Sequence, residues 1–503
     1  MVVPGDDRVT LAGGAQPTPA FADDPPRLAS LLSLAVAALD AGRRARGGPV
    51  PAGAPGQPHA ALRALAGDTL PQHGSGEEAA LHALTQLLAE GHADPTEPAC
   101  AAHLHCPPLA VAVAADAAVS ALNPSLDSWD QGPSSAAAEE LLLRWLAELA
   151  GFDVARAGGT LTTGASASTL TALLLARDGF ASGRPLRIAC SEHAHFSVQR
   201  AAQILGLGEQ AVDVVPCDEQ GRLAPEALAA LAEADRRPRD AAGVRRPGRE
   251  AAGARVQPAR VVVATAGTTD LGAIDPLPAI ADLAEQHRWW LHVDAAYGGG
   301  ALWSRVLRPL LRGLDRATSV ALDAHKLGWQ PAACGVLLLA DRSAMAPLAR
   351  EVAYLNAADD DAAGYEDRLG RSLRTTRRPD AFKLLVTIHA LGVGGLGLLV
   401  DRCHELARCV YDTAAAEPSL EVFGPPTLTT VLLRPRLDDP VARDERCATI
   451  RRRLLASGTA VVGRTELPGD GPGRRWLKLT LLHPGATVAD AQQLISEIAR
   501  SNR

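Results

Sequence analysis

The stretch TSVALDAHKLGWQP, residues 318–331, begins as a β-rich apolar run and continues into an aspartate, a histidine and a lysine. It predicts a buried strand followed directly by Lys326. Ligands of parallel sheets bind beyond the carboxyl ends of the strands, so an amine at this place can reach a bound molecule. Of the 50 basic residues only three are lysines, Lys326, Lys383 and Lys478, so few amines are available for such a role. Taken alone, a lysine is usually just solvated.

Further β-rich runs lie on both sides of this stretch and alternate with helical patterns. The alternation is typical of a mostly parallel sheet covered by helices on both faces, which is an α/β fold. After Arg378 a helical stretch leads to the runs LEVFGPP, TTVLLRPR and RWLKLTLL and a final amphipathic helix, which predict a smaller α+β domain. The other runs of the large sheet are LRIAC (186–190), AVDVVPC (211–217), RVVVATAG (260–267), WWLHVDAA (289–296) and CGVLLLA (334–340).

These patterns divide the chain into an N-terminal part (1–115), a large domain (116–383) and a small C-terminal domain (384–503). The first part is expected to hold a disordered leader of roughly 28 residues and helices at 28–41 and 77–90. Because these helices are too short to form a core, we expect them to dock elsewhere, for example on a second subunit. The segment 235–259, rich in Arg, Pro, Gly and Ala, is interpreted as a solvated insertion rather than a surface for an acidic partner.

Composition excludes several classes of function. The net charge of −7 and the pI near 6.1 give no basic footprint for nucleic acid, so a small-molecule partner fits better. The apolar stretches are expected to stop well short of the ~18 residues of a membrane helix, and the N-terminus lacks the pattern of a secretory signal. Eight cysteines without CxxC pairs favour reduced thiols in a cytoplasmic protein, with neither a metal site nor a disulfide framework.

Two polar residues could complete a site around Lys326. WLHVDAAYGGG (290–300) puts Asp294 at the end of another expected strand, where it could pair with a protonated ring nitrogen of a bound cofactor. CSEHAHFSVQRAA (190–202) puts His195 after a strand, where it could lie over the same ring. Each is weak by itself, since an aspartate at a strand end is commonly a cap and a lone histidine is usually structural.

A phosphate cradle is expected further upstream. GGTLTTGASASTLTALLLAR (158–177) reads as a Gly/Ser/Thr loop that runs into a helix beginning near Ala167. The backbone N–H groups of Gly164, Ala165 and Ser166, the Ser166 hydroxyl and the helix dipole could together bind a phosphate. The loop has neither the GxxxxGK[ST] nor the GxGxxG pattern, and an ordinary helix N-cap explains it equally well on its own.

The combination of ATAGTTDLGAIDP (264–276), HVDAAYGG (292–299) and DAHK (323–326) resembles the group II pyridoxal-phosphate-dependent amino acid decarboxylases. This family includes the aromatic amino acid, glutamate and diaminobutyrate decarboxylases, and the likeness runs from about Ala101 to the C-terminus. It implies pyridoxal 5′-phosphate as cofactor and the aspartate aminotransferase-like type I fold. It also implies an obligate homodimer with active sites at the subunit interface.

The resemblance assigns a role to each matching residue. Lys326 would hold the cofactor as a Schiff base, and Asp294 would pair with the pyridine nitrogen. His195 would stack on one face of the ring, Ala296 would support the other, and Thr269 would lie beside the O3′ atom. The remaining matches, near the phosphate or supporting the site, are Ala165, Ser166, Ser319, Asp323, His325 and, as a structural acid, Asp275.

Three residues outside this cluster also match functional positions of the family. Tyr354, in EVAYLNAADDDAAGYEDRLG (351–370), matches a tyrosine on a mobile loop that reprotonates the substrate carbon, and Tyr365 is the less favoured donor. A tyrosine at 354 favours decarboxylation over the oxidative deamination of related aldehyde synthases, which carry phenylalanine there. Lys478 matches a basic position that binds the substrate carboxylate in glutamate decarboxylases, and His105 lies in the segment that lines the pocket entry. Lys478 could instead be solvated, and His105 purely structural.

The substrate is indicated by local likeness. HLHCPP (103–108), LNPSLDSWDQ (122–131) and SLRTTRRPDAFKL (372–384) are most similar to diaminobutyrate decarboxylases, which convert L-2,4-diaminobutyrate to 1,3-diaminopropane. The chain departs from those enzymes at Ala167, Pro379 and His483. Decarboxylation of an aromatic amino acid, glutamate or aspartate, and an aldehyde synthase activity, therefore stay open as alternatives. An interaction protein without catalysis is a further one.

Overall fold

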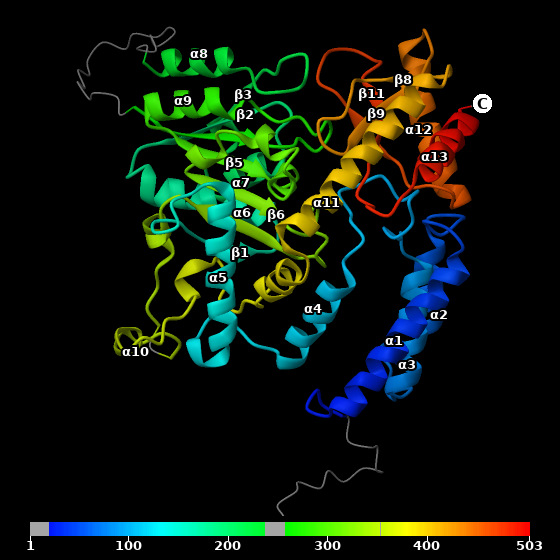
Figure 1. Cartoon of the computed structure of the whole chain (residues 1–503), viewed down its shortest axis with the longest axis horizontal. Coiled ribbons are helices and arrows are strands. Elements are labelled where there is room, and N and C mark those ends of the chain that lie inside the picture. Colours follow the sequence, from blue (N-terminus) through cyan, green and yellow to red (C-terminus); the bar gives the residue numbers. More distant parts are fainter. Residues whose placement is uncertain (1–19, 237–256, 353, 503) are drawn as a thin grey trace, which may run out of the picture.

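The computed structural model describes residues 20–236, 257–352 and 354–502, and it contains two sheets (Figure 1). The larger has seven strands in the order β1-β7-β6-β5-β4-β2-β3. Strands β2 to β6 run parallel to one another, and β7 is antiparallel to both neighbours, so the expected mostly parallel sheet is confirmed. The strands are β1 (Gly158–Thr162), β2 (Leu186–Ser191), β3 (Val212–Val215), β4 (Ala259–Thr265), β5 (Trp290–Ala295), β6 (Ser319–Asp323) and β7 (Gly335–Leu339).

The central strands of this sheet are covered on both faces. Every residue of β4, β5, β6 and β7 is buried. Along β4, Val261 and Val263 pack into the core that includes α6 (Ala165–Leu175). Val262 points to the opposite core, which includes α5 (Pro133–Ala150) and α9 (Leu277–His287). Because side chains alternate along a strand, a strand covered on both faces needs apolar residues at nearly every position. This requirement explains why these strands could be predicted from continuous apolar runs in the sequence.

The start of α6 differs from the expectation. Residues 158–162, expected to belong to a loop, form β1, and α6 begins at Ala165 rather than near Ala167. The turn between them is tight: a Cβ atom on Gly335 of the paired strand would lie 2.4 Å from the Cα atom of Gly164, whose φ is +153°. A turn that passes this close to a neighbouring strand requires glycine, and the same glycines made the segment read as a loop.

The N-terminal helices α1 (Pro25–Arg46), α2 (Gln57–Ala66) and α3 (Glu77–Glu90) stand beside the small domain (Figure 1). The side chain of Asp24 accepts from the N–H of Arg27, so α1 starts slightly earlier than expected. Buried Arg46 donates to the buried carboxylate of Asp94 at 2.7 Å and fixes the end of α1. Residues 1–19 of the expected leader, and 237–256 of the expected insertion, lie outside the described residues.

The small domain is an antiparallel four-stranded sheet in the order β10-β11-β9-β8, with its own core. The predicted α+β unit with a final amphipathic helix is thus confirmed. The last helix begins with a capping box in which Thr487 and Asp490 satisfy each other's backbone N–H groups. The elements are β8 (Leu420–Val422), β9 (Thr430–Pro435), β10 (Gly463–Glu466), β11 (Arg475–Thr480), α12 (Pro440–Ser457) and α13 (Val488–Ser501).

Helix α11 (Ala381–Ala416) links the two units, and it corrects one expectation. By length and composition it is apolar enough to cross a membrane, although no apolar stretch was expected to approach that length. Its backbone breaks at Gly392, where φ is +64°, and the part beyond the break packs into both cores, with Leu396 in the large one and Leu406 in the small one. The expected domain boundary at 383/384 falls inside this helix, and that at 115/116 falls inside α4 (Ala110–Leu122). The other described α-helices are α7 (Ser197–Ile204), α8 (Pro225–Arg236) and α10 (Ala358–Ala362).

Candidate active site

A pocket lies at the carboxyl ends of the parallel strands, where the sequence placed it. Eight of the ten residues expected around the cofactor line it, and they come from the ends of β5 and β6, the start of α6, and the loops after β2 and β4. These eight are Ala165, Ser166, His195, Thr269, Asp294, Ala296, Asp323 and Lys326. The same edge of one sheet therefore gathers side chains that are up to about 160 residues apart in the chain.

Lys326 is held by the aspartate at the end of its own strand. Its Nζ atom lies 3.0 Å from Asp323 Oδ2, and its side chain is 18% exposed, which leaves the amine open to the pocket. The other oxygen of Asp323 accepts from the backbone N–H of Ala165 at 2.7 Å. The carboxylate thus already accepts the hydrogen bond of the first N–H of α6, which is one of the groups expected to bind a phosphate. Ser166, exposed at the next position, lines the same pocket.

Asp294 lies across the pocket on the neighbouring strand. It is 6% exposed and accepts from the N–H of Ala296 at 3.1 Å. Thr265 pairs with it in register on β4 and also lines the pocket. The Thr265 hydroxyl oxygen is buried and has no hydrogen-bond partner among the described residues. A buried polar atom without a partner is costly, so this hydroxyl is suited to a polar group of a bound molecule.

His195 enters the pocket from the loop after β2. Its Nδ1 atom accepts from the backbone N–H of Ser197 at 3.3 Å and lies 2.9 Å from the Ser197 hydroxyl. Since Nδ1 accepts, the neutral ring carries its hydrogen on Nε2. Burial lowers the pKa of His195 below its usual value, although neighbouring carboxylates including Asp294 oppose the shift. The ring is therefore neutral and fixed in orientation at pH 7.

The turn after β4 supplies Thr269 and is packed tightly against the turn after β5. A Cβ atom on Gly267 would lie 2.6 Å from the nitrogen of Gly298, so the position requires glycine. The strand end is secured by Asp275, which accepts from the N–H groups of Thr265 and Leu223 at 2.7 Å each. Burial raises the pKa of Asp275 to about 6. Asp275 thus holds the backbone of the site, as expected for a structural acid.

Tyr297 connects the pocket to the small domain. It is 2% exposed, and its hydroxyl lies 2.7 Å from the hydroxyl of Thr429 and 2.9 Å from that of Thr430. Tyr297, Ser197, Thr265 and Gly267 line the pocket but were not predicted. All four lie inside the quoted motifs, next to predicted residues, so proximity in the sequence was the available signal.

Two of the residues expected near the phosphate do not line the pocket. Ser319 is the first residue of β6, whereas the pocket lies at its last, Asp323. Its hydroxyl lies 2.8 Å from ring nitrogens of both Trp290 and His292, so the structure gives it a role in the core. His325 has Nδ1 3.1 Å from the carbonyl oxygen of Cys334 and Nε2 3.7 Å from Asp323, and its ring adjoins Gly164, where an added Cβ atom would lie 3.4 Å from Cε1.

The three outlying predictions also fall outside the pocket lining. Tyr354 is 82% exposed, and the nearby α10 lies far from β5 and β6 (Figure 1). His105 is exposed beside His92, at a ring centroid distance of 6.4 Å. Lys478 is the nearest of the three, because its Nζ atom donates to the carbonyl oxygen of Thr269 at 3.3 Å. It is buried and adjoins the pocket from the small domain.

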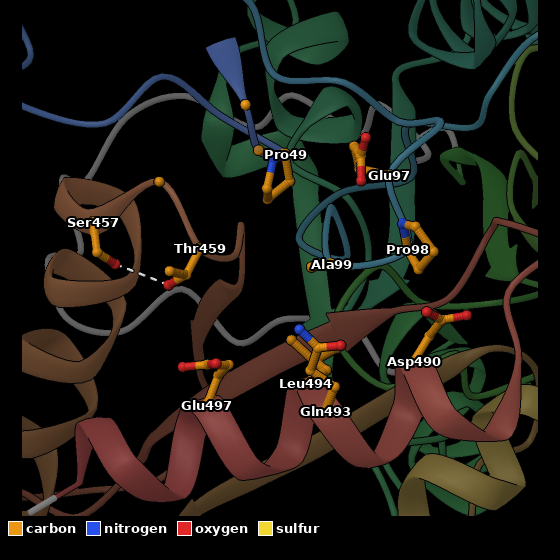
Figure 2. A pocket seen from close by; sticks show the side chains of 13 residues that line it. Pro49, Glu97, Pro98, Ala99, Ser457, Thr459, Asp490, Gln493, Leu494 and Glu497 are labelled. Atoms are coloured by element: carbon orange, nitrogen blue, oxygen red, sulfur yellow. Dashed lines mark hydrogen bonds between the residues drawn. The ribbon is translucent and has the colours of Figure 1, made fainter. Parts of the chain in front are cut away.

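A larger hollow, of about 350 Å³, lies elsewhere, between the N-terminal segment and the small domain (Figure 2). Its carboxylates include Asp490, which caps α13 through Thr487, and Glu497, which pairs with Arg500. Glu97 reaches it from the segment opposite α13. The hollow contains none of the predicted site residues, so size does not mark the site in this molecule.

The chain was compared with known families and proteins. The model of the pyridoxal-dependent decarboxylase conserved domain matches residues 58–242 and 250–435. The chain is a pyridoxal-dependent decarboxylase. The predicted family and its cofactor are thereby confirmed.

Individual pyridoxal-dependent decarboxylases resemble the chain over most of its length. An L-2,4-diaminobutyrate decarboxylase of Rhizobium meliloti is 41% identical over 87% of this chain and 84% of its own. An acidic amino acid decarboxylase of Homo sapiens is 31% identical over 75% and 72%. The crystal structure of the glutamate decarboxylase domain of a diaminobutyrate-pyruvate transaminase and L-2,4-diaminobutyrate decarboxylase from Vibrio parahaemolyticus has a TM-score of 0.78, at 31% identity over 94% and 95%. This agreement also bears out the type I fold.

The pocket of this decarboxylase fits pyridoxal phosphate. It offers an accessible amine on Lys326, a buried carboxylate on Asp294 and the neutral ring of His195 in its lining. The unpartnered hydroxyl of Thr265 adds a hydrogen-bonding group that the protein itself does not satisfy. The amine, the carboxylate and the histidine ring match the aldehyde carbon, the ring nitrogen and the flat ring face of pyridoxal phosphate, in that order.

Proposed function

We propose that the protein decarboxylates L-2,4-diaminobutyrate to 1,3-diaminopropane and carbon dioxide. The proposal is carried by the gathering of Lys326, Asp294 and His195 around one pocket, in a chain 41% identical to a protein named for that activity. Bound in this pocket, pyridoxal phosphate supplies an electron sink for the carbon that loses the carboxylate.

In this proposal each pocket residue has one task. The amine of Lys326 holds the cofactor and is kept in place by Asp323 at 3.0 Å. Asp294, at 6% exposure, keeps a proton on the ring nitrogen, because a buried carboxylate favours a cation beside it strongly. The neutral ring of His195 stacks on the cofactor without adding a charge that would oppose the ring proton.

The phosphate would lie at the start of α6, against Ser166 and the N-terminal end of the helix dipole. Asp323 already accepts from the N–H of Ala165, so the proposal assigns the phosphate to the groups beyond it. Ala296 is small and 9% exposed, and it leaves room for a flat ring close to the backbone. Lys478, beside Thr269, is proposed to meet the carboxylate of the substrate. His105 has no proposed contact with the substrate within its own chain.

We also propose that the working unit is a homodimer with active sites at the subunit interface. Tyr354 is 82% exposed and outside its own chain's pocket, which supports a donor supplied by the partner subunit's Tyr354. Apolar side chains are exposed on α1, α3, α4 and α11, which supports a covering partner. They include Val36, Leu88, Val113, Leu122, Leu391 and Leu398. A cytoplasmic location belongs to the proposal too, since all eight cysteines are free thiols.

A substrate panel tests this proposal. The holoenzyme is incubated with L-2,4-diaminobutyrate, glutamate, aspartate and an aromatic amino acid, and the released carbon dioxide and amine are measured. We expect the highest kcat/KM with L-2,4-diaminobutyrate and 1,3-diaminopropane as its product. Release from the other amino acids alone would overturn the substrate. Oxygen consumption with ammonia release would instead identify an aldehyde synthase.

A further inference from the structure

An ion pair bridges the two domains beside the cofactor pocket. Lys478, on β11 of the small domain, reaches the turn after β4, where its Nζ atom lies 3.3 Å from the carbonyl oxygen of Thr269 and 3.7 Å from Asp270 Oδ1. Thr269 lines the pocket. Neither charged residue lines the pocket itself, but Asp270 follows the pocket residue Thr269 directly, and Lys478 contacts the carbonyl oxygen of Thr269.

The position of Asp270 is fixed by its turn. The N–H of Gly272 donates to the carbonyl oxygen of Thr268 at 2.8 Å, and the N–H of Ala273 donates to the Thr268 hydroxyl at 3.1 Å. The side chain of Asp270 is 34% exposed, so it is open to a ligand. Burial lowers the pKa of His193 and of His195, and the charge of Asp270 opposes this shift in both. The charge of Asp270 is therefore felt at both histidines of the loop after β2.

Neither member of the pair is well satisfied by the other. The separation of 3.7 Å exceeds the length of a good charge-assisted hydrogen bond, which is about 2.8 Å. Lys478 is 8% exposed, and burial lowers its pKa. An ammonium group has three donors, and a buried one gains most from a full anionic partner. The pair can exchange partners with a ligand that carries both charges.

We propose that Asp270 is the specificity-determining residue that binds the side-chain ammonium of the substrate, and this rests on the proposed function. In the bound state Lys478 turns to the substrate carboxylate and Asp270 takes the ammonium, so one loose ion pair is replaced by two. A substrate with an acidic side chain, such as glutamate, would be repelled by the negative charge of Asp270. The site therefore selects amino acids whose side chain ends in a cation.

Binding of two isosteric amines to the holoenzyme tests the role of Asp270 without turnover. 1,3-Diaminopropane carries the second ammonium, and butylamine has a methyl group in its place. For Asp270→Asn we expect the affinity for 1,3-diaminopropane to fall by about tenfold or more, as for loss of a hydrogen-bonded charge partner, while that for butylamine changes less than about twofold. Both dissociation constants are measured by titration calorimetry.

The matched control is Asp282→Asn, which removes the same charge from α9, where the side chain is 70% exposed. It should leave the affinity for both amines unchanged. Equal weakening of the two amines by Asp270→Asn, or no weakening of either, would overturn the role of Asp270. Decarboxylation of L-2,4-diaminobutyrate by the wild-type protein is measured in parallel. Its absence would count against the proposed function, while the amine titrations would still decide on Asp270.

Discussion

The pocket edge of the large sheet, where Asp294 and Lys326 lie, and the loop that carries Tyr354 differ in how far their side chains are buried within one chain. At the sheet edge, Asp294 is 6% exposed and Lys326 is paired at 3.0 Å. Tyr354 is 82% exposed, although its loop is secured nearby by Asn356, whose side chain accepts from the N–H of Val352 and donates to the carbonyl oxygen of Arg350, both at 2.8 Å. The side chains of the first region gather within one chain, whereas the second region presents its key side chain outward.

The contrast separates two kinds of functional residue. Those expected to hold the cofactor are fixed by strands of one chain and by the turns between them. A residue that acts late in a reaction and must let the substrate enter can be carried by a surface loop of another subunit. This difference supports the proposed homodimer.

Removing the amine at the sheet edge should have the largest effect. Lys326→Ala is expected to abolish the visible absorbance of the cofactor Schiff base and to lower kcat by about 10³-fold or more, since no other described lysine lines the pocket. Absorbance spectra and carbon dioxide release measure the two effects. A variant that retains a borohydride-reducible band would show that the amine has been assigned wrongly.

Complementation between variants tests whether the two regions come from different chains. Tyr354→Phe alone should reduce decarboxylation by about 10²-fold or more and increase oxygen consumption. If each site combines its own Lys326 with the partner subunit's Tyr354, mixing Lys326→Ala with Tyr354→Phe after subunit exchange should restore about a quarter of the wild-type rate.

The control for this mixing experiment pairs two residues of the sheet edge, Lys326→Ala and Asp294→Asn. Both belong to the pocket of one chain, so the mixture should remain as inactive as its components. Failure of the first mixture to regain activity, with heterodimers verified by mass spectrometry, would place Tyr354 and Lys326 in the same chain's site.

A smaller effect is expected at Thr265. Replacing its unpartnered hydroxyl in Thr265→Val should weaken pyridoxal phosphate binding by up to about tenfold, while the cofactor-free protein keeps or gains stability. Thr480→Val is the matched control, because Thr480 is also a buried threonine with an unpartnered hydroxyl but does not line the pocket. Cofactor titration and urea unfolding measure the two quantities. Equal loss of affinity in both variants would mean that Thr265 does not contact the cofactor.

The smallest effect concerns the charge of His195. Burial lowers its folded-state pKa below the unfolded value of about 6.5, so its contribution to stability is present above that pH and is lost as the pH falls through the lowered pKa. The free energy of unfolding should therefore drop less between pH 7.5 and pH 5 in His195→Gln than in the wild type. Urea unfolding at the two pH values measures this difference. Identical drops would show that the histidine is not buried as described.

The sequence predicted most of the sheet and most of the pocket for one physical reason. Strands buried on both faces leave continuous apolar runs, and the residues at their carboxyl ends, such as Asp294 and Lys326, must converge on one edge. The packing of side chains and turns across the sheet could not be predicted from the sequence. Ser319 matches a family position, but it begins its strand and its hydroxyl lies in the core. The glycines of 158–164 made this segment read as a loop, although it contains β1, which pairs closely with β7.

Residues that act between units could not be located from the sequence either. Tyr354 was singled out by its motif, but the motif does not report that the side chain lies outside the pocket of its own chain. The contact of Lys478 with the turn at Thr269 depends on how the small domain docks, and no pattern within β11 reports it. The two predicted boundaries fall inside helices α4 and α11, and α11 packs into both cores, which no local pattern reports.

The scarcity of lysine has a practical consequence for chemical labelling. All three lysines are engaged in ion pairs, but the side chains of Lys383 and Lys478 are only 1% and 10% exposed, whereas that of Lys326 is 18% exposed and opens to the pocket. An amine-acylating reagent applied to the folded, cofactor-free chain should therefore modify Lys326 ahead of the other two lysines. Mass spectrometry of the digested protein would then report cofactor occupancy directly as the protected fraction of one peptide.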